Sequence, residues 1–284
     1  MDNKIKLGDY NILRVRKRTD YGLYLDGGEE GNILLPTRYV TPSMRIGSEV
    51  EVFLYLDHEE RLVATTEHPL AKVGEFAFLE CTWTNEYGAF LNWGLMKDLF
   101  CPFREQKMRM ERGRGYIVYV RMDEDSYRLM ATAKVDKFLK VPQQGANATF
   151  CHGQEVDCLV WQKTDLGFKV IVDNAYQGQL YDRQVFQPLR TGNRIRAYID
   201  HVRMDGKIDL TLQPTGHRHT LDFAEQLLQY LYEHDGRCDL GDKSPSEAIA
   251  ERFSVSKKAF KKAVGDLYKR RLITISDTGI ELVD

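Results

Sequence analysis

Two pairs of aromatic side chains recur at the same spacing in the N-terminal half of the chain. Tyr21 and Tyr24 lie on either side of a glycine, and Tyr87 and Phe90 repeat that arrangement. A strand can expose both flanking rings, which could then stack on unpaired nucleobases, an interaction worth about 1–3 kcal/mol per base. The alternative is that the rings only cover a barrel. We favour the binding interpretation for these four residues.

A one-sided cluster of positive charge lies near the C-terminus. Between residues 252 and 271 there are eight basic residues and one acid. Such a cluster attracts phosphates without reading a base sequence, although it could also be the solvated face of a protein-docking domain. A second basic group lies in residues 104–114, where solvated loop charges are an equally good interpretation. The candidate phosphate contacts are Lys257, Lys258, Lys261, Lys262, Lys269, Arg270, Arg271, Arg104, Lys107 and Arg109.

Motifs for catalysis or metal binding are not found in the sequence. It contains no GxxxxGK[ST] loop, HExxH helix or GxSxG elbow. The five cysteines include no CxxC pair, and the histidines do not complete a zinc-binding spacing. We therefore expect no enzymatic activity, no cofactor, no metal and no small-molecule substrate.

The elements that must position the aromatic pairs come from a threefold repeat. Nine glycines form three triplets, and within every triplet the second and third glycines follow the first by 14 and 39 residues. Alternating apolar residues between them indicate short strands. A repeat of roughly 65–75 residues with four or five strands favours a small closed barrel of the OB type, in which glycines permit bends and close backbone approach. The glycines are Gly8, Gly22 and Gly47; Gly74, Gly88 and Gly113; and Gly153, Gly167 and Gly192.

The last seventy residues follow a different period. Apolar residues from Leu221 to Leu231, from Ile249 to Phe253 and from Ala259 to Leu267 recur at helical spacing. Segments 272–275 and 280–283 then read as a hairpin. Helix, helix, turn, helix and hairpin predict a winged helix. The predicted fold is mainly β with a C-terminal α+β domain: barrels at residues 1–66, 67–140 and 141–214, and a winged helix-turn-helix domain at 215–284.

The glycine framework with an aromatic-Gly-x-aromatic centre resembles the S1-type RNA-binding domain, an OB-fold. In that family both aromatics and a histidine fourteen residues after the central glycine lie on the RNA-binding face. The third copy departs from this pattern with Leu166 and Lys169, and the histidine position reads Pro36, Pro102 and Tyr181. In the third copy we expect Phe168 to belong to the core.

The order of three S1-like copies and a winged helix, with the basic runs at residues 256–263 and 267–273, resembles the bacterial conserved virulence factor B family along the whole chain. This resemblance implies an RNA-binding protein that affects gene expression and has no catalytic activity. The expected partner is single-stranded RNA.

Two other hypotheses stay open. The winged helix could make the protein a DNA-binding transcriptional regulator whose barrels dock proteins. Alternatively, the chain could be an interaction scaffold on the ribosome or the RNA-decay machinery. Specific operator recognition is less expected, because few residues suited to reading base edges stand among the lysines.

Composition is that of an ordinary globular protein, with 43% hydrophobic and 29% charged residues. With 40 Lys and Arg against 42 Asp and Glu, the net charge is -2, so bulk charge does not indicate a nucleic-acid partner. No apolar run approaches the roughly 18 residues of a spanning helix, and the start lacks the apolar stretch of a secretory signal. We expect a cytoplasmic protein with no membrane partner.

The three tryptophans receive different interpretations. We interpret Trp83 and Trp161 as barrel residues, whereas Trp93, in an Asn-Trp-Gly sequence, is expected to be an exposed loop aromatic.

Overall fold

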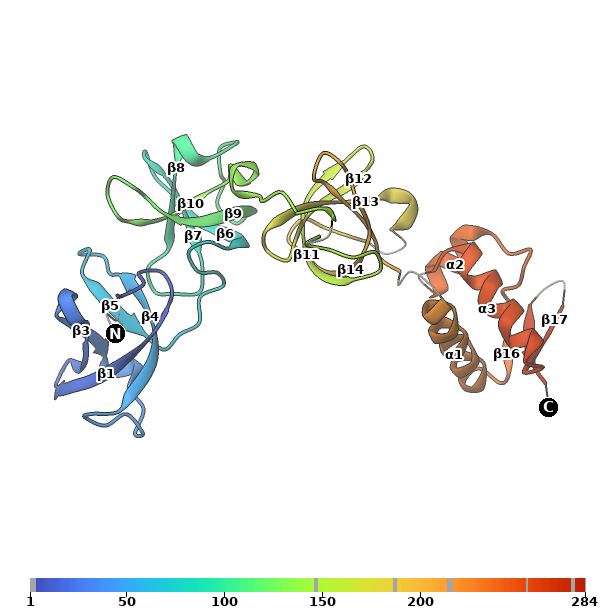
Figure 1. Ribbon diagram of the computed structural model, residues 1–284, viewed down its shortest axis with the longest axis horizontal. Helices are drawn as coiled ribbons and strands as arrows, with labels where there is room; N and C mark the ends of the chain where they lie inside the picture. Colours follow the sequence, from blue (N-terminus) through green and yellow to red (C-terminus); the bar gives the residue numbers. More distant parts are fainter. Residues whose placement is uncertain are drawn as a thin grey trace. The chain divides into compact units, whose positions relative to one another are not determined.

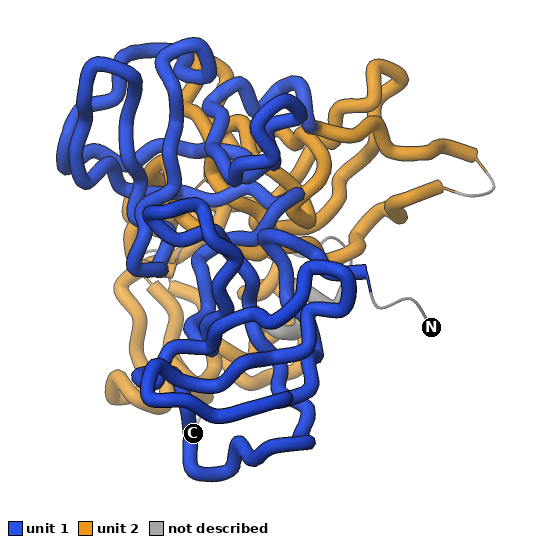
Figure 2. The backbone as a smooth tube through the Cα atoms, turned by 90° about the vertical axis from the view of Figure 1, so that its left-hand side faces the viewer, with its two compact units in different colours: residues 1–138 blue, residues 139–284 orange. Residues whose placement is uncertain are grey.

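The computed structural model describes residues 4–145, 148–185, 188–213, 217–253, 255–276 and 279–283, and only the backbone of residues 217–222. The chain divides into two compact units, residues 1–138 and 139–284 (Figure 2). Predictions that concern Pro214, the Leu221 side chain, Ser254 and the turn at 277–278 lie outside the described residues. No helix within the described part is long and apolar enough to cross a membrane.

The first unit contains two closed five-stranded barrels (Figure 1). Barrel 1 consists of β1 (Tyr10–Thr19), β2 (Gly22–Asp26), β3 (Asn32–Pro36), β4 (Glu49–Leu56) and β5 (Leu62–Thr65), in the order β1-β2-β3-β5-β4. Barrel 2 consists of β6 (Phe76–Thr84), β7 (Gly88–Asn92), β8 (Leu99–Pro102), β9 (Gly115–Met122) and β10 (Leu129–Thr132), with the equivalent order. One parallel pair closes each barrel, β3 with β5 and β8 with β10.

The second unit contains a third barrel with the same topology. Barrel 3 consists of β11 (Glu155–Thr164), β12 (Gly167–Val172), β13 (Tyr176–Tyr181), β14 (Arg194–Val202) and β15 (Ile208–Thr211). Its closing pair, β13 with β15, is again parallel. A 3₁₀ turn follows the third strand of every barrel, at Thr37–Tyr39, Phe103–Glu105 and Asp182–Gln184.

The central glycine of each triplet is required by the way the barrel closes. A Cβ at Gly22 would lie 2.1 Å from the carbonyl oxygen of Leu35 on β3. The distance to the equivalent carbonyl oxygen is 2.4 Å at Gly88 and 2.0 Å at Gly167. Gly22 and Gly167 also have φ of 142° and 138°, which favour glycine. The close backbone approach that the glycine repeat predicted is confirmed.

The first strand of each barrel carries a β-bulge that re-aims the next side chain. In β6 the pairing register shifts between Cys81 and Trp83, and β1 and β11 shift at the equivalent positions. Residues two apart in a regular strand share a face. In β6, however, Cys81 is fully buried while Trp83 is 45% exposed, because the bulge interrupts the alternation between them. It therefore places Trp83 on the outer surface of barrel 2.

Barrels 1 and 2 share an apolar core. The cluster that fills barrel 2 includes Phe53, Tyr55 and Val63 of barrel 1. Phe53 packs edge-on against Trp93 of barrel 2, with the ring centroids 5.8 Å apart. Burying apolar surface between them joins the two barrels into one unit.

The C-terminal residues form a winged helix. It contains α1 (His217–Glu233), β16 (Arg237–Cys238), α2 (Ser246–Phe253), α3 (Lys257–Lys269), β17 (Ile273–Ile275) and β18 (Ile280–Leu282). The helices pack around Phe223, Phe260 and Leu267. The predicted hairpin is present, and the two-residue strand β16, too short for a sequence signal, extends it to a three-stranded sheet in the order β16-β18-β17. The predicted fold class, three OB-like barrels followed by a winged helix, is confirmed.

Candidate nucleic-acid interface

Barrel 2 carries a flat aromatic platform. Trp83 on β6 pairs with Phe90 on β7, and their rings stack with centroids 3.8 Å apart and an interplanar angle of 3°. Phe100 on β8 lies next to Phe90 at 5.0 Å between centroids. Tyr87, in the turn before β7, is 66% exposed. The structure thus adds Trp83 to the two aromatics that the sequence identified here.

The platform lies in a groove of about 930 Å³. Its walls include Tyr87, Phe90 and Trp83 from barrel 2 and Tyr55 and His58 from barrel 1. Ligand pockets typically enclose about 300–1,000 Å³, so this groove is large enough for a nucleotide. Tyr87 and Phe90, predicted from the sequence, are therefore brought together in one concave site.

The cations that line this groove already have protein partners. The pairs are Lys97 Nζ with the Asp57 carbonyl oxygen at 2.7 Å, Arg104 with Asp123 at 3.0 Å, and Arg128 with Glu60. Backbone N–H groups of Ser126 and Asp125 donate to Asp123 and hold its pKa below the usual range, and Arg104 adds to this effect. Burial lowers the pKa of Lys97. A phosphate at Arg104 would therefore compete with Asp123.

The other predicted cations of barrel 2 are also engaged. Lys107 forms an ion pair with Asp136. The Arg109 guanidinium lies 3.5 Å from the centroid of the Phe103 ring. These contacts hold both side chains against barrel 2.

Barrel 1 presents a different version of the same surface. Tyr21 is 76% exposed, and Tyr24 on β2 is half-buried. Lys17 occupies the place of Trp83, and its ammonium lies 4.7 Å from the centroid of the Tyr24 ring. A cation rather than a second ring therefore covers Tyr24, which suits a phosphate-bearing ligand next to a base.

An arginine recurs in the 3₁₀ turn after the third strand of every barrel. Arg38, Arg104 and Arg183 each follow the central glycine by 16 residues. Arg38 lies over the Tyr39 ring at 4.5 Å, and Arg183 lies 5.4 Å from the Tyr181 ring. Alignment of the three copies at this offset is the signal that would have identified Arg38 and Arg183 from the sequence.

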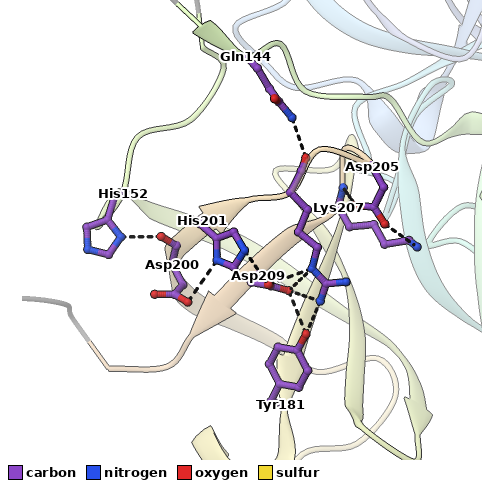
Figure 3. Close-up of polar contacts among 9 residues, drawn as sticks. Gln144, His152, Tyr181, Asp200, His201, Asp205, Lys207 and Asp209 are labelled. Atoms are coloured by element: carbon purple, nitrogen blue, oxygen red, sulfur yellow. Dashed lines mark hydrogen bonds and ion pairs between the residues drawn. The ribbon is translucent and has the colours of Figure 1, made fainter.

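Barrel 3 has a polar network instead of an aromatic platform. Arg203 Nε donates to both carboxylate oxygens of Asp209 at 2.9 Å, and His201 Nε2 lies 3.2 Å from the same carboxylate (Figure 3). The Tyr181 hydroxyl contacts Asp209 at 3.4 Å and also Arg203. Asp209 is only 6% exposed. Tyr181, at the position of the family's RNA-binding histidine, is thus engaged within the barrel.

The positions of the aromatic pair are also altered in barrel 3. Leu166 is 68% exposed, and Lys169 points its ammonium toward Trp161, 5.5 Å from the ring centroid. Phe168 is buried in the core, as the sequence predicted. No flat exposed ring stack is formed by these positions.

Helix α3 presents its lysines on the surface opposite its buried face. The Ser256 hydroxyl oxygen accepts a hydrogen bond from the Ala259 N–H and caps the helix. Phe260, Ala263, Val264 and Leu267 are buried. Two cations of α3 and its C-cap are paired, Lys261 with Asp242 and Arg270 with Asp266, both at 3.4 Å, and Arg252 on α2 pairs with Asp239. In the described part of the chain, the side chains of Lys257, Lys258, Lys262, Lys269 and Arg271 make no hydrogen bond or ion pair within the protein.

The sequence assigned one of the three tryptophans, Trp93, to the wrong environment. Trp93 is only 2% exposed, and its indole N–H donates to the Lys97 carbonyl oxygen at 2.7 Å. It is buried because its loop packs against Phe53 of barrel 1. Trp83 and Trp161 lie on β6 and β11, as expected of barrel residues, although the bulge exposes Trp83 and Trp161 is buried.

Among the residues that the structure describes, no group of three or more His, Cys, Asp or Glu side chains could hold a metal ion.

Two family descriptions match this chain. Residues 7–67 match the S1 domain, and residues 225–282 match the CvfB-like winged helix domain. Both domain types are typical of nucleic-acid-binding proteins.

The sequence matches to similar proteins extend over most of the chain. Protein YitL of Bacillus subtilis is 27% identical, with 94% of this chain and 91% of YitL covered. Conserved virulence factor B of Staphylococcus saprophyticus is 24% identical, and the match covers 99% of this chain and 96% of that protein. A crystal structure of a multidomain protein with nucleic acid binding domains from Streptococcus pneumoniae is 21% identical, covers 98% of both chains and has a TM-score of 0.44. The chain is thus similar along most of its length to conserved virulence factor B, and it matches the S1 domain in its first barrel and the CvfB-like winged helix domain near its C-terminus.

Proposed function

We propose that this chain is a non-catalytic protein that binds single-stranded RNA in the cytoplasm and regulates gene expression after transcription. The observation that carries the proposal is the stacked pair of Trp83 and Phe90, both of which line the groove on barrel 2. Unpaired bases present flat faces that stack on such rings, whereas bases within a duplex do not. A single strand is therefore the ligand that this surface fits.

Barrel 1 supports the same ligand by different means. Its residues 7–67 match the S1 domain, and Tyr21 offers an exposed ring beside the Lys17–Tyr24 contact. Two neighbouring surfaces in one unit can hold successive nucleotides of one strand, which raises affinity by increasing the effective concentration at the second surface.

Helix α3 supplies the phosphate contacts in this proposal. Lys258 and Lys262 are exposed and lie four residues apart, so they share one side of the helix. Each phosphate neutralised by a lysine releases a counterion, which makes affinity fall with salt. Contacts of this kind strengthen binding without selecting a base sequence.

The test is a fluorescence anisotropy titration of the full chain with labelled single-stranded RNA, single-stranded DNA and duplex DNA of equal length, at several salt concentrations. We expect the tightest binding to single-stranded RNA and a linear decrease of log K with log salt. Tighter binding to duplex DNA would contradict the proposal. Binding to none of the three would instead favour a scaffold that docks on the ribosome or the RNA-decay machinery.

A second candidate function is duplex DNA binding through the winged helix, favoured by the exposed lysines of α3. The two candidates separate with the variant Lys258→Glu plus Lys262→Glu. If the winged helix is the principal binding site, this variant loses duplex binding altogether. If the barrels bind single-stranded RNA, the variant keeps the RNA preference and shows a smaller salt dependence.

A further inference from the structure

The groove on barrel 2 is completed by barrel 1. Tyr55 and His58, at and beyond the end of β4, line it together with Trp83 and Phe90. The Lys97 ammonium joins the two barrels at this point by its hydrogen bond to the Asp57 carbonyl oxygen. The two walls therefore belong to one packed unit, and a ligand that enters the groove contacts both barrels.

The charge of the groove favours a base over a phosphate. Lys97, Arg104 and Arg128 line it, but each is already paired with a protein acceptor. Four carboxylates also line the groove, those of Glu60, Asp98, Asp123 and Asp125. A phosphate entering here would meet more negative charges than positive ones, so we expect the phosphates to stay outside.

Asp98 is the carboxylate best placed to contact a stacked base. It lies directly before β8, and its Oδ2 accepts a hydrogen bond of 2.6 Å from the Thr82 hydroxyl. Thr82 immediately precedes Trp83, in the bulge of β6. This contact fixes the carboxylate beside the aromatic platform, and each carboxylate oxygen can accept further hydrogen bonds.

We propose that this composite groove takes one base of the bound strand and prefers a base with an exocyclic amino group, which donates to the Asp98 carboxylate. The inference rests on the proposed binding of single-stranded RNA and adds a base preference to it. Cytosine and uracil make the sharpest comparison, because position 4 carries an amino donor in cytosine and a carbonyl acceptor in uracil. A carboxylate that faces this position accepts a hydrogen bond from the amino group and is repelled by the carbonyl oxygen.

The test compares two RNA octamers, one of uridines only and one with a single central cytidine, by titration of the full chain. Intrinsic fluorescence reports entry into the groove, because Trp83 is 45% exposed while Trp93 and Trp161 are 2% and 7% exposed. We expect the cytidine octamer to bind about tenfold more tightly, as a good side-chain contact to a base edge allows. Binding should quench the fluorescence of the wild type but not that of Trp83→Phe.

The decisive variant is Asp98→Asn, which keeps the shape of the side chain and can still accept a hydrogen bond from the Thr82 hydroxyl. Its amide can donate to the uracil carbonyl, so the preference for cytidine should disappear or reverse. The matched control is Asp165→Asn, which removes one exposed carboxylate from barrel 3 and should keep the wild-type ratio. Cytidine monophosphate is titrated in parallel to distinguish a free nucleotide from a base within a strand.

Several outcomes would overturn this inference. Equal binding of the two octamers, or an unchanged ratio in Asp98→Asn, would remove the base preference while leaving RNA binding intact. Binding without quenching would place the strand elsewhere on the protein. Cytidine monophosphate that binds as tightly as the octamer would identify a free nucleotide as the ligand. Among the outcomes of this experiment, only the absence of binding to either octamer would count against the proposed function itself.

Discussion

Barrels 2 and 3 share one framework and differ in the surface built on it. Both close with the same strand order, and both place a glycine where a Cβ would meet a backbone oxygen, at 2.4 Å and 2.0 Å. Barrel 2 then exposes stacked rings above a groove, whereas barrel 3 pairs its polar side chains with one another. Barrel closure and ligand contact are therefore controlled by different residues.

The largest expected effect tests the shared framework. Gly88→Ala and Gly167→Ala should each destabilise their own barrel by about 3 kcal/mol, because in both cases a Cβ collides with backbone rather than with a movable side chain. Urea unfolding followed by tryptophan fluorescence measures this, since Trp83 and Trp93 report barrel 2 and Trp161 reports barrel 3.

The matched control for these variants is Gly265→Ala in α3, where a Cβ meets nothing within 4 Å. It should stabilise the helix by about 0.5–1 kcal/mol. A well-tolerated alanine at Gly88 or Gly167 would show that the two barrels do not depend on the same close approach.

The second prediction concerns the network of barrel 3. Asp209→Ala should destabilise that barrel by about 2–3 kcal/mol, because it leaves Arg203 and the Tyr181 hydroxyl without their carboxylate partner. RNA affinity should stay near the wild-type value. Asp205→Ala, which removes an exposed ion pair with Lys207, is the control and should change stability by less than about 1 kcal/mol. Loss of RNA binding on replacing Asp209 would assign barrel 3 a role in recognition.

The third prediction concerns the aromatic surface of barrel 2. Tyr87→Ala plus Phe90→Ala should weaken single-stranded RNA binding by about 2 kcal/mol, roughly thirtyfold, because a stacking surface is lost. The barrel should remain folded in circular dichroism. The matched variant Leu166→Ala plus Lys169→Ala changes the same positions of barrel 3 and should leave affinity unchanged. Equal losses from the two double variants would refute the contrast between the barrels.

The smallest expected effect concerns α3. Lys258→Gln plus Lys262→Gln should lower the slope of log K against log salt for single-stranded RNA by about 1.4, which corresponds to two phosphate contacts. The affinity loss at moderate salt should be only several-fold. Anisotropy titrations at four salt concentrations measure the slope, and Glu225→Gln plus Glu233→Gln on α1 serve as the control. An unchanged slope would show that these lysines do not contact the strand.

Much of the fold was predictable because it depends on local patterns. The glycine offsets identified three barrels, and the change of period after residue 214 identified the winged helix. The sequence also placed Tyr87 and Phe90 correctly on one surface. Trp93 was misassigned because its burial depends on Phe53 in another barrel, and the exposure of Trp83 was not foreseen because strand alternation cannot reveal a bulge.

The repeated barrels, the aromatic pairs and the basic helix follow from the amino-acid sequence, since short-range spacing and charge encode each of these features. Which residues meet depends on the folded chain. Folding assembled one groove from two barrels, paired the cations that line it, and engaged Tyr181 with Asp209. The physical reason is that hydrogen bonds, ion pairs and ring stacks depend on distances across strands, and chain closure sets those distances between residues far apart in sequence.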